Sequence, residues 1–326
     1  DYHRGDAFQP EDESSIRMTA MPTAARRDGI AHVMMLFAVV IFALNYVVGR
    51  WAAGDTPPYM MGFVRWGAGM LILLPFAWSR LKKDRDFICR NWKLLCLAGF
   101  LMPFMGAGVS YVAMIHTSAI NAGVIVTSMP VMMVLLSWVF LNERITGAVW
   151  LGIAVAIAGV LYIVSRGDPA SLRNLSFNIG DLILIGCNLG LAGYGVAIKK
   201  LPQGIHQMSL ITVVCAVGAL CHVPFFAYEM ASGVQIVLSP KTFVSLAFVA
   251  IFPSVVAILI WNSAIGRIGP SRSAFYMYLT PVFAAIFAIP LLGESIGVYH
   301  IIGAVLIVIG VTLASRKARP ARYEIT

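Results

Sequence analysis

The sequence predicts an all-α polytopic membrane protein that crosses the bilayer ten times. Of its 326 residues, 59% are hydrophobic and 12% are charged, whereas soluble domains average about 25% charged residues. The mean hydropathy is +0.82, and the apolar residues form long unbroken runs instead of the alternation typical of a membrane barrel. These observations exclude a soluble globule, a disordered chain and a disulfide scaffold.

Each of ten apolar runs is long enough to cross the bilayer, because a hydrocarbon core of about 30 Å needs about 20 helical residues. In chain order the predicted spans are residues 30–48, 59–78, 94–114, 119–140, 146–164, 179–198, 210–228, 243–265, 273–292 and 298–314. The short connections carry turn residues, such as Pro57-Pro58 and Gly269-Pro270. Consecutive spans are therefore expected to be antiparallel neighbours.

The basic residues predict that both chain ends are cytoplasmic. With the N-terminus inside, 19 of the 24 Lys and Arg residues fall on the cytoplasmic side and four on the other, while Arg65 lies within a span. We expect a cytoplasmic polar tail at residues 1–29, part of it foreign to the natural chain, and a basic cytoplasmic tail at 315–326. The net charge of +9 therefore needs no nucleic-acid partner.

The two halves, residues 30–164 and 179–314, repeat each other at an offset of 151 residues. Because each half contains five spans, an odd number, the two copies must cross the membrane in opposite directions. Inverted repeats of this kind are typical of secondary transporters, whose substrate site lies near the midplane where the halves meet. The pairs that carry the repeat include Pro130/Pro281, Leu141/Leu292, Glu143/Glu294, Gly152/Gly303 and Gly159/Gly310.

These motifs resemble a known family. The run Pro130-Val131, Leu141-Asn142-Glu143-Arg144-Ile145, Gly152 and Gly159-Val160, together with its counterpart from Pro281 to Val311, resembles the EamA repeat of the drug/metabolite transporter superfamily. Phe63-Val64-Arg65-Trp66 is similar to the Arg-containing second helix of that family. The resemblance covers nearly all of residues 30–314. It implies two inverted five-helix repeats in a bacterial cytoplasmic (inner) membrane and export of small metabolites, and exporters of aromatic and other amino acids are the most similar.

Polar side chains at membrane depth are costly and therefore mark a candidate substrate cavity. Arg65 is either a partner for a substrate carboxylate or a side chain that snorkels to the interface. Asn45 and Asn188 either bind substrate or join helices, and each Ser or Thr has the alternative of a hydrogen bond within its own helix. The candidates are Asn45, Tyr46, Arg65, Tyr111, Thr127, Ser128, Asn188, Tyr194, Ser254, Tyr276 and Tyr278, with Trp261 as a further aromatic wall.

Two prolines and two glutamates are candidates for kinks and gates. Pro130 and Pro281 each remove a helix hydrogen bond, so matched kinks would open a polar cavity between the halves. Glu143 and Glu294 lie at matching helix ends. They are either gating residues or structural ones that stabilise the N-terminal end of the following helix by about 0.3–1 kcal/mol.

The predicted function is secondary transport of a small organic metabolite, an aromatic amino acid foremost, by alternating access. No acidic residue lies deep in a predicted span, which favours facilitated diffusion or exchange over ion-coupled pumping. A channel-like facilitator and an exporter of drugs or other metabolites are the alternatives. An enzyme is disfavoured, because the sequence lacks the GxSxG and HExxH patterns. We expect a small-molecule substrate and the lipid bilayer as partners, no cofactor, metal or nucleic acid, and leave a homodimer open.

Overall fold

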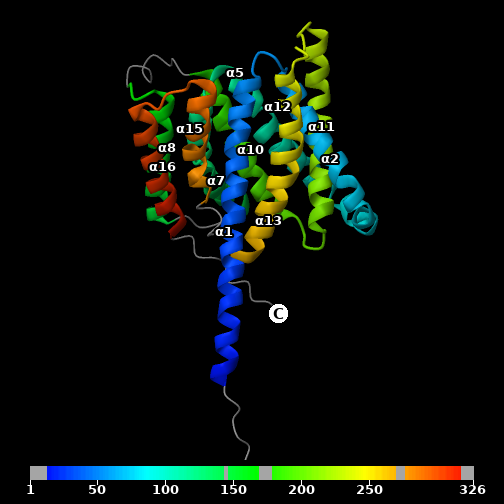
Figure 1. Ribbon diagram of the computed structural model, residues 1–326, viewed down its shortest axis with the longest axis vertical. Coiled ribbons are helices and arrows are strands. Elements are labelled where there is room, and N and C mark those ends of the chain that lie inside the picture. Colours follow the sequence, from blue (N-terminus) through cyan, green and yellow to red (C-terminus); the bar gives the residue numbers. More distant parts are fainter. Residues whose placement is uncertain (1–12, 143–145, 169–177, 269–275, 317–326) are drawn as a thin grey trace, which may run out of the picture.

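The computed structural model describes residues 13–142, 146–168, 178–268 and 276–316, and every element within these ranges is a helix. The helices stand side by side along one axis (Figure 1), and α1 (Glu13–Ala52) projects from the bundle at the end where it begins and where α16 (Val298–Arg316) finishes. We call this the terminal end and the opposite one the distal end. The all-helical fold confirms the class that the sequence predicts.

The first half of the chain continues from α1 through eight further elements. They are α2 (Pro58–Lys83), α3 (Arg85–Arg90), α4 (Trp92–Gly99), the π-helix η1 (Phe100–Gly108), α5 (Ser110–His116), α6 (Ala119–Val126), α7 (Met129–Leu141) and α8 (Gly147–Val164). The second half follows the same order. Its elements are α10 (Ile179–Lys200), α11 (Gln207–Ala231), α12 (Pro240–Ile251), the π-helix η2 (Phe252–Val256), α13 (Ala257–Ile268), the 3-10 turn η3 (Met277–Leu279), α15 (Thr280–Leu292) and α16.

The described residues contain seven helices that are long and apolar enough to cross a membrane, and an eighth span if α6 and α7 are joined across their 41° bend. Shorter apolar helices cover Met277–Leu292 and Val298–Leu313, where the sequence predicts the last two spans. Many large apolar side chains are exposed along these helices. This is expected where lipid, not water, surrounds the protein.

Proline residues interrupt spans that the sequence predicts as continuous. η1 contains Pro103 and η2 contains Pro253, at matching places in the two halves. A proline lacks the backbone N–H, and its ring displaces the carbonyl of the preceding turn, so the helix widens or breaks there. The predicted spans 94–114 and 243–265 are each divided into three elements for this reason. Pro130 follows the break between α6 and α7, and Pro281 is the second residue of α15.

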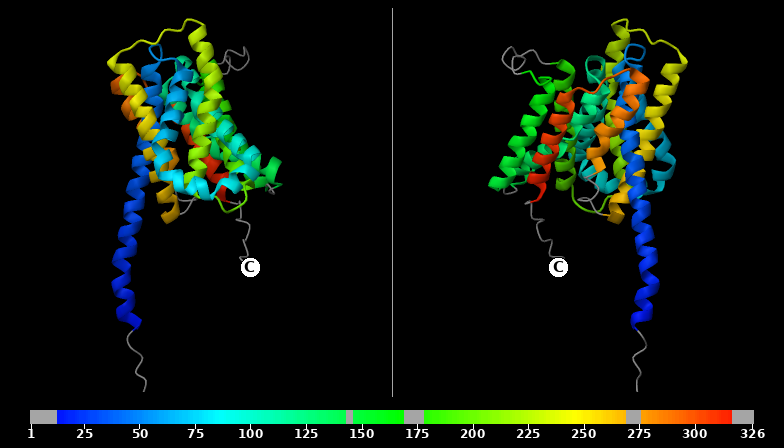
Figure 2. Two further views of the ribbon diagram at one scale, coloured as in Figure 1. Left: turned by 90° about the vertical axis from the view of Figure 1, so that its right-hand side faces the viewer. Right: turned by 60° about the vertical axis from the view of Figure 1, so that its left-hand side comes forward.

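The last helices of the two halves, α8 and α16, pack directly against each other at the edge of the bundle (Figure 2). The glycines that carry the repeat meet here and bring the two backbones into contact. A Cβ added at Gly159 would lie 2.9 Å from the carbonyl oxygen of Gly303, and one at Gly310 would lie 2.5 Å from that of Gly152. Small residues are what permit such close approach between membrane helices.

We expect Gly159→Ala to destabilise the protein by about 1–3 kcal/mol, because backbone atoms cannot move aside as a side-chain tip can. Gly186→Ala is the matched control, since a Cβ there meets nothing within 4 Å and alanine favours a helix by about 1 kcal/mol over glycine. Thermal unfolding of the purified protein in detergent measures both. Equal melting temperatures for the two variants would contradict the close contact of α8 and α16.

Candidate functional site

A cavity of about 350 Å³ lies between the two halves of the chain. Its lining runs from Asn45 and Arg65 to Trp261 and Met277, and Trp261 packs against Ala31 and Met35 of α1. Its volume lies within the range of small-molecule sites, about 300–1,000 Å³. Twelve lining residues come from the first half and eight from the second: Phe42, Asn45, Tyr46, Arg65, Trp66, Met102, Gly106, Ala107, Ser110, Val126, Met129 and Met133, then Leu191, Tyr194, Gly195, Pro253, Ile258, Trp261, Met277 and Thr280.

Arg65 is the charged side chain among these lining residues. It is 5% exposed, and its Nη1 donates to the Tyr111 hydroxyl at 3.0 Å and to Asn45 Oδ1 at 3.3 Å. The Tyr111 hydroxyl in turn donates to Asn45 Oδ1 at 2.7 Å. The guanidinium carbon lies 4.7 Å from the ring centroid of Trp66, a cation–π distance. Three helices of the first half thus fix the guanidinium through neutral groups.

Four of the eleven polar candidates from the sequence border the cavity: Asn45, Tyr46, Arg65 and Tyr194. Trp261, expected as an aromatic wall, borders it too. Tyr111 is buried beside Arg65 and holds it in place.

Three further candidates make structural hydrogen bonds and are not among the residues that border the cavity. Thr127 and Ser128 donate to the carbonyls of Val124 and Ile125 in the preceding turn, at 2.6 and 2.7 Å. Asn188 donates to the same Ile125 carbonyl at 2.7 Å and to the Ser128 hydroxyl at 3.2 Å. Asn188 therefore connects α10 to the break between α6 and α7, where the N–H groups of Thr127 and Ser128 donate to carbonyls three residues back.

The remaining candidates also make structural contacts. The Ser254 hydroxyl donates to the Val249 carbonyl at 2.6 Å across η2. Tyr276 shares a hydrogen bond with His32 of α1, and Tyr278 packs against the largest apolar cluster. None of the three is among the residues that border the cavity.

Several lining residues carry no signal in the sequence. Met102, Met129, Met133 and Met277 contribute much of the apolar wall, yet methionine is ordinary in a membrane helix. Trp66 lies next to Arg65 and is 1% exposed, and its Nε1 has no hydrogen-bond partner among the described residues. Its place directly after the one basic residue within a span is the only hint that the sequence offers.

At the distal end, two glutamates bind the first amides of helices that belong to the other half. Glu229, near the end of α11, accepts from the backbone N–H groups of Tyr59 and Met60 at 3.1 Å each. Its two oxygens thereby accept hydrogen bonds from two N–H groups in the first turn of α2, which has no side-chain cap of its own.

Glu294 makes the equivalent contact with α6, accepting from the N–H groups of Ala119 and Ile120 at 2.8 and 3.0 Å. The sequence predicts that Glu294, if structural, stabilises the start of the helix that follows it. The observed contact is instead with α6, a helix of the first half. Sequence proximity cannot reveal this, because the partner is more than 170 residues away. Glu143, the repeat counterpart, lies outside the described residues. We call Glu229 and Glu294 the distal caps.

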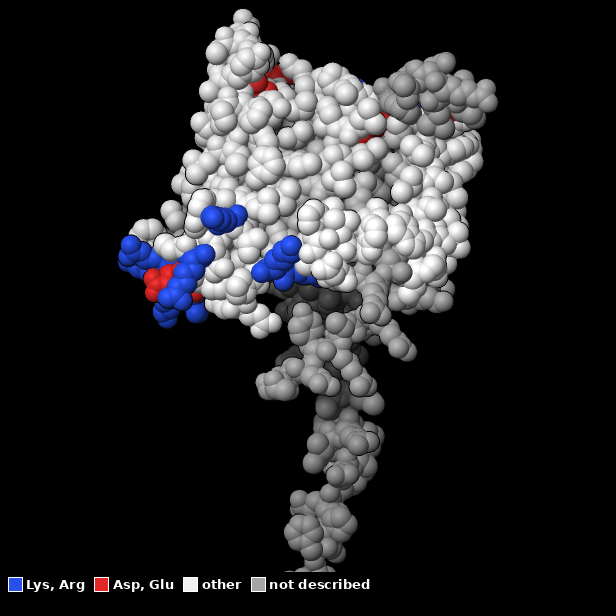
Figure 3. Space-filling model, turned by 180° about the vertical axis from the view of Figure 1, so that it is seen from behind, with Lys and Arg blue, Asp and Glu red and all other residues white. Residues whose placement is uncertain are grey.

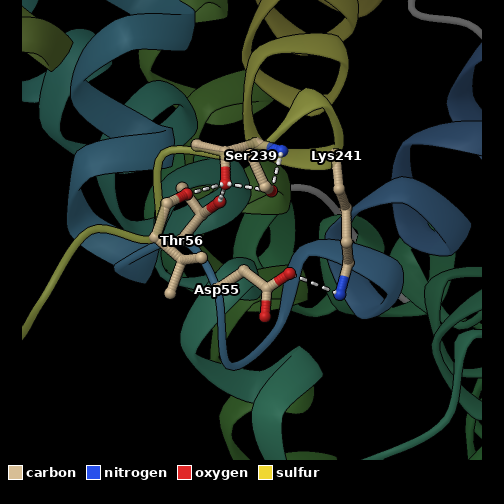
Figure 4. A network of polar contacts seen from close by, with 6 residues as sticks. Asp55, Thr56, Ser239 and Lys241 are labelled. Carbon is tan, nitrogen blue, oxygen red and sulfur yellow. Dashed lines mark hydrogen bonds and ion pairs between the residues drawn. The ribbon is translucent and has the colours of Figure 1, made fainter.

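A smaller polar network also lies at the distal end and joins the loop after α1 to the start of α12 (Figure 4). Lys241 forms an ion pair with Asp55 at 2.8 Å, and the Val237 N–H donates to the Asp55 carbonyl at 3.1 Å. The Thr56 hydroxyl lies 3.5 Å from that of Thr242. The ion pair is about 30% exposed on each side, so its contribution is about 0–1 kcal/mol.

The fold and the cavity together define a class: a helical membrane protein whose two repeated halves enclose a solute-sized cavity. The profile of the EamA-like transporter family matches residues 29–165 and 178–316, one match for each half. The chain therefore belongs to the EamA-like transporter family, which confirms the resemblance seen in the sequence.

Relatives of similar length support this assignment. An uncharacterized transporter of Bacillus subtilis, YyaM, is 29% identical over 86% of this chain and 90% of its own. The uncharacterized inner membrane transporter YedA of Escherichia coli K12 is 29% identical over 86% and 89%. A probable amino-acid metabolite efflux pump of the same organism is 25% identical over 88% and 94%. A crystal structure that is 16% identical, with a TM-score of 0.56 over 90% of this chain, shares the fold. The relatives are named as transporters, which agrees with a non-enzymatic function.

Proposed function

We propose that this transporter exports small organic metabolites, aromatic amino acids foremost, across the bacterial cytoplasmic membrane by alternating access. The observation that carries the proposal is the cavity between the halves, in which one fixed cation faces a wall of methionine and aromatic side chains. This is a combination suited to a carboxylate attached to an apolar body. The relative named as an amino-acid metabolite efflux pump adds support.

The proposed topology has ten spans in two inverted repeats, divided at residues 30–164 and 179–314, with both termini cytoplasmic. Two shorter apolar helices supplement the seven spans that length and hydropathy support among the described residues, or eight with α6 and α7 joined. Lys and Arg side chains gather at the terminal end of the face shown in Figure 3, as the positive-inside rule requires of a cytoplasmic side.

In this orientation the structure corresponds to an inward-facing state. The cavity lining includes Trp261 of α13, a helix that reaches the terminal end (Figure 1). The distal caps and the network around Asp55 join the two halves at the other end. Transport then requires those distal contacts to break while contacts at the terminal end form. The proposed gating role of Glu294 is to hold the distal end closed, and Glu143 takes the corresponding role in the opposite state.

Labelled phenylalanine, tryptophan or threonine added to proteoliposomes preloaded with unlabelled amino acids tests the proposal. We expect saturable uptake that the internal amino acids stimulate. Tyr194→Ala should slow uptake at low substrate concentration by about tenfold or more, because a buried aromatic side chain contributes about 1.5–3 kcal/mol. Tyr228→Ala is the control, since that side chain is 73% exposed and is not among the residues that line the cavity.

Two results would contradict the proposal in different ways. Uptake that rises linearly with concentration and ignores the internal amino acids would indicate a channel-like facilitator. Saturable exchange of drugs or other metabolites, with no response to any amino acid, would show that the protein is a carrier whose substrate is not an amino acid.

We further propose that transport proceeds by facilitated diffusion or exchange, because no carboxylate is found among the residues that border the cavity. An imposed pH gradient alone should therefore not accumulate substrate in proteoliposomes. Accumulation under that gradient would contradict this part of the proposal.

A further inference from the structure

We infer that the cavity recognises an organic anion through its carboxylate alone, and that the α-ammonium group of an amino acid is dispensable for binding. The inference rests on the proposed function and narrows it. It predicts that carboxylic acids without an amino group bind at least as well as the amino acids that share their apolar body.

The first step is the uncompensated charge of Arg65. The side chain is 5% exposed, and its two described hydrogen-bond partners, Asn45 and Tyr111, are neutral. No carboxylate in the described part of the chain forms an ion pair with it. A buried charge without a counter-ion is costly, so a ligand that supplies the negative charge is stabilised strongly at this position.

The second step is the kind of polar atom that is left without a partner. Arg65 Nε and Trp66 Nε1 are buried donors with no acceptor within the described residues, and the Thr280 hydroxyl also lacks a partner. Two of these atoms can only donate. They suit a ligand group that is rich in acceptors, and a carboxylate accepts up to four hydrogen bonds.

The third step is the immediate surroundings of Arg65, which disfavour an ammonium next to the bound carboxylate. An ammonium has donors only, and the two acceptors bonded to Arg65 are already engaged: the Tyr111 hydroxyl accepts from Arg65, and Asn45 Oδ1 accepts from both Arg65 and Tyr111. The face of Trp66 carries the guanidinium and is therefore not free for a second cation. An α-ammonium beside the carboxylate would also be repelled by Arg65.

The fourth step is the shape of the remaining wall. Phe42, Met129, Met133, Trp261 and Met277 contribute an apolar surface to the cavity. Methionine side chains adapt to aromatic and aliphatic partners alike. A single carboxylate on a bulky apolar body fits this arrangement, whereas a small or doubly charged anion leaves the apolar wall empty.

Three probes with the same phenylethyl body test the inference: 3-phenylpropionate, phenylalanine and 2-phenylethylamine. Their binding to the purified full-length protein in detergent is measured by isothermal titration calorimetry, which avoids passive diffusion of the acid through vesicles. We expect the acid to bind at least as tightly as phenylalanine and the amine at least tenfold more weakly than the acid. Arg65→Gln should weaken binding of the acid at least tenfold. Arg80→Gln, at an exposed position on the same helix, should leave the affinity for the acid unchanged.

The ranking of the three probes on the unmodified protein decides the outcome even if Arg65→Gln fails to fold. Phenylalanine that binds more than tenfold tighter than 3-phenylpropionate, or an acid that does not bind, overturns the inference. Phenylalanine counterflow reports on the proposed function separately. If the acid binds but amino-acid counterflow fails, the proposed amino-acid substrate is wrong, and the inference that the cavity recognises carboxylic acids is supported.

Discussion

Replacement of both distal caps, Glu229→Gln with Glu294→Gln, is expected to open the distal end of the bundle. Each glutamate accepts two backbone N–H groups from a helix of the other half. Hydrogen bonds to charged groups contribute about 1.5–3 kcal/mol each, and glutamine keeps one acceptor oxygen without the charge. Loss of about 1.5 kcal/mol at each cap corresponds to a shift of roughly a hundredfold in the equilibrium between closed and open.

Labelling of a single cysteine measures this shift. In a chain whose five native cysteines are replaced, Met129→Cys places a thiol on the cavity wall. A membrane-impermeant maleimide added at the distal side should label it much faster in the double variant. Asp55→Asn at the same end is the matched control. It removes only a partly exposed ion pair, so labelling should change less than about fivefold. Equal labelling in the double variant and this control would show that the caps do not hold the distal end closed.

The second large effect is expected at the contact between Gly62 and His222. The His222 ring is fully buried, and its Nδ1 is hydrogen-bonded to the Gly218 carbonyl at 2.7 Å. A Cβ at Gly62 would lie 2.2 Å from His222 Nε2. Because the ring cannot move aside, Gly62→Ala should destabilise the protein by about 2–3 kcal/mol.

Gly67→Ala on the same helix is the control, since its nearest neighbour would be 3.9 Å away. The decisive measurement is the double variant with His222→Ala. Removal of the ring should cancel most of the cost of Gly62→Ala, with a coupling free energy above about 1 kcal/mol. Additive losses in the double variant would mean that the ring is not the obstacle.

The architecture is largely predictable from the sequence, and the reason is physical. The lengths of the apolar runs and the repeat of Pro130 at Pro281 can be read directly from the sequence. The folded chain shows the corresponding features: long apolar helices, and a proline as the second residue of both α7 and α15. The π-helices at Pro103 and Pro253 are less accessible to such reasoning. A proline inside an apolar run shows that the helix is disturbed, but it does not show whether the helix kinks, widens or stops.

The cavity is much harder to predict, because lipid and an apolar cavity select the same side chains. Met133 borders the cavity, whereas Ile286 is 54% exposed on the outside of the bundle, and hydropathy does not separate them. Polar residues were the available signal. They identified Arg65 and Asn45, but also Asn188, which joins helices. Glu229 was missed because a carboxylate at a helix end is ordinary until its distant partner is known.

The distal caps also affect which residues of each contact can change in evolution, because one partner is a side chain and the other is the backbone. The partners of Glu229 and Glu294 are backbone N–H groups at residues 59, 60, 119 and 120, and every amino acid except proline supplies one. Ala119 and Ile120 are buried in an apolar cluster, so packing restricts their side chains. Tyr59 and Met60 are partly exposed, and natural variants should change more freely at these two positions while Glu229 stays fixed.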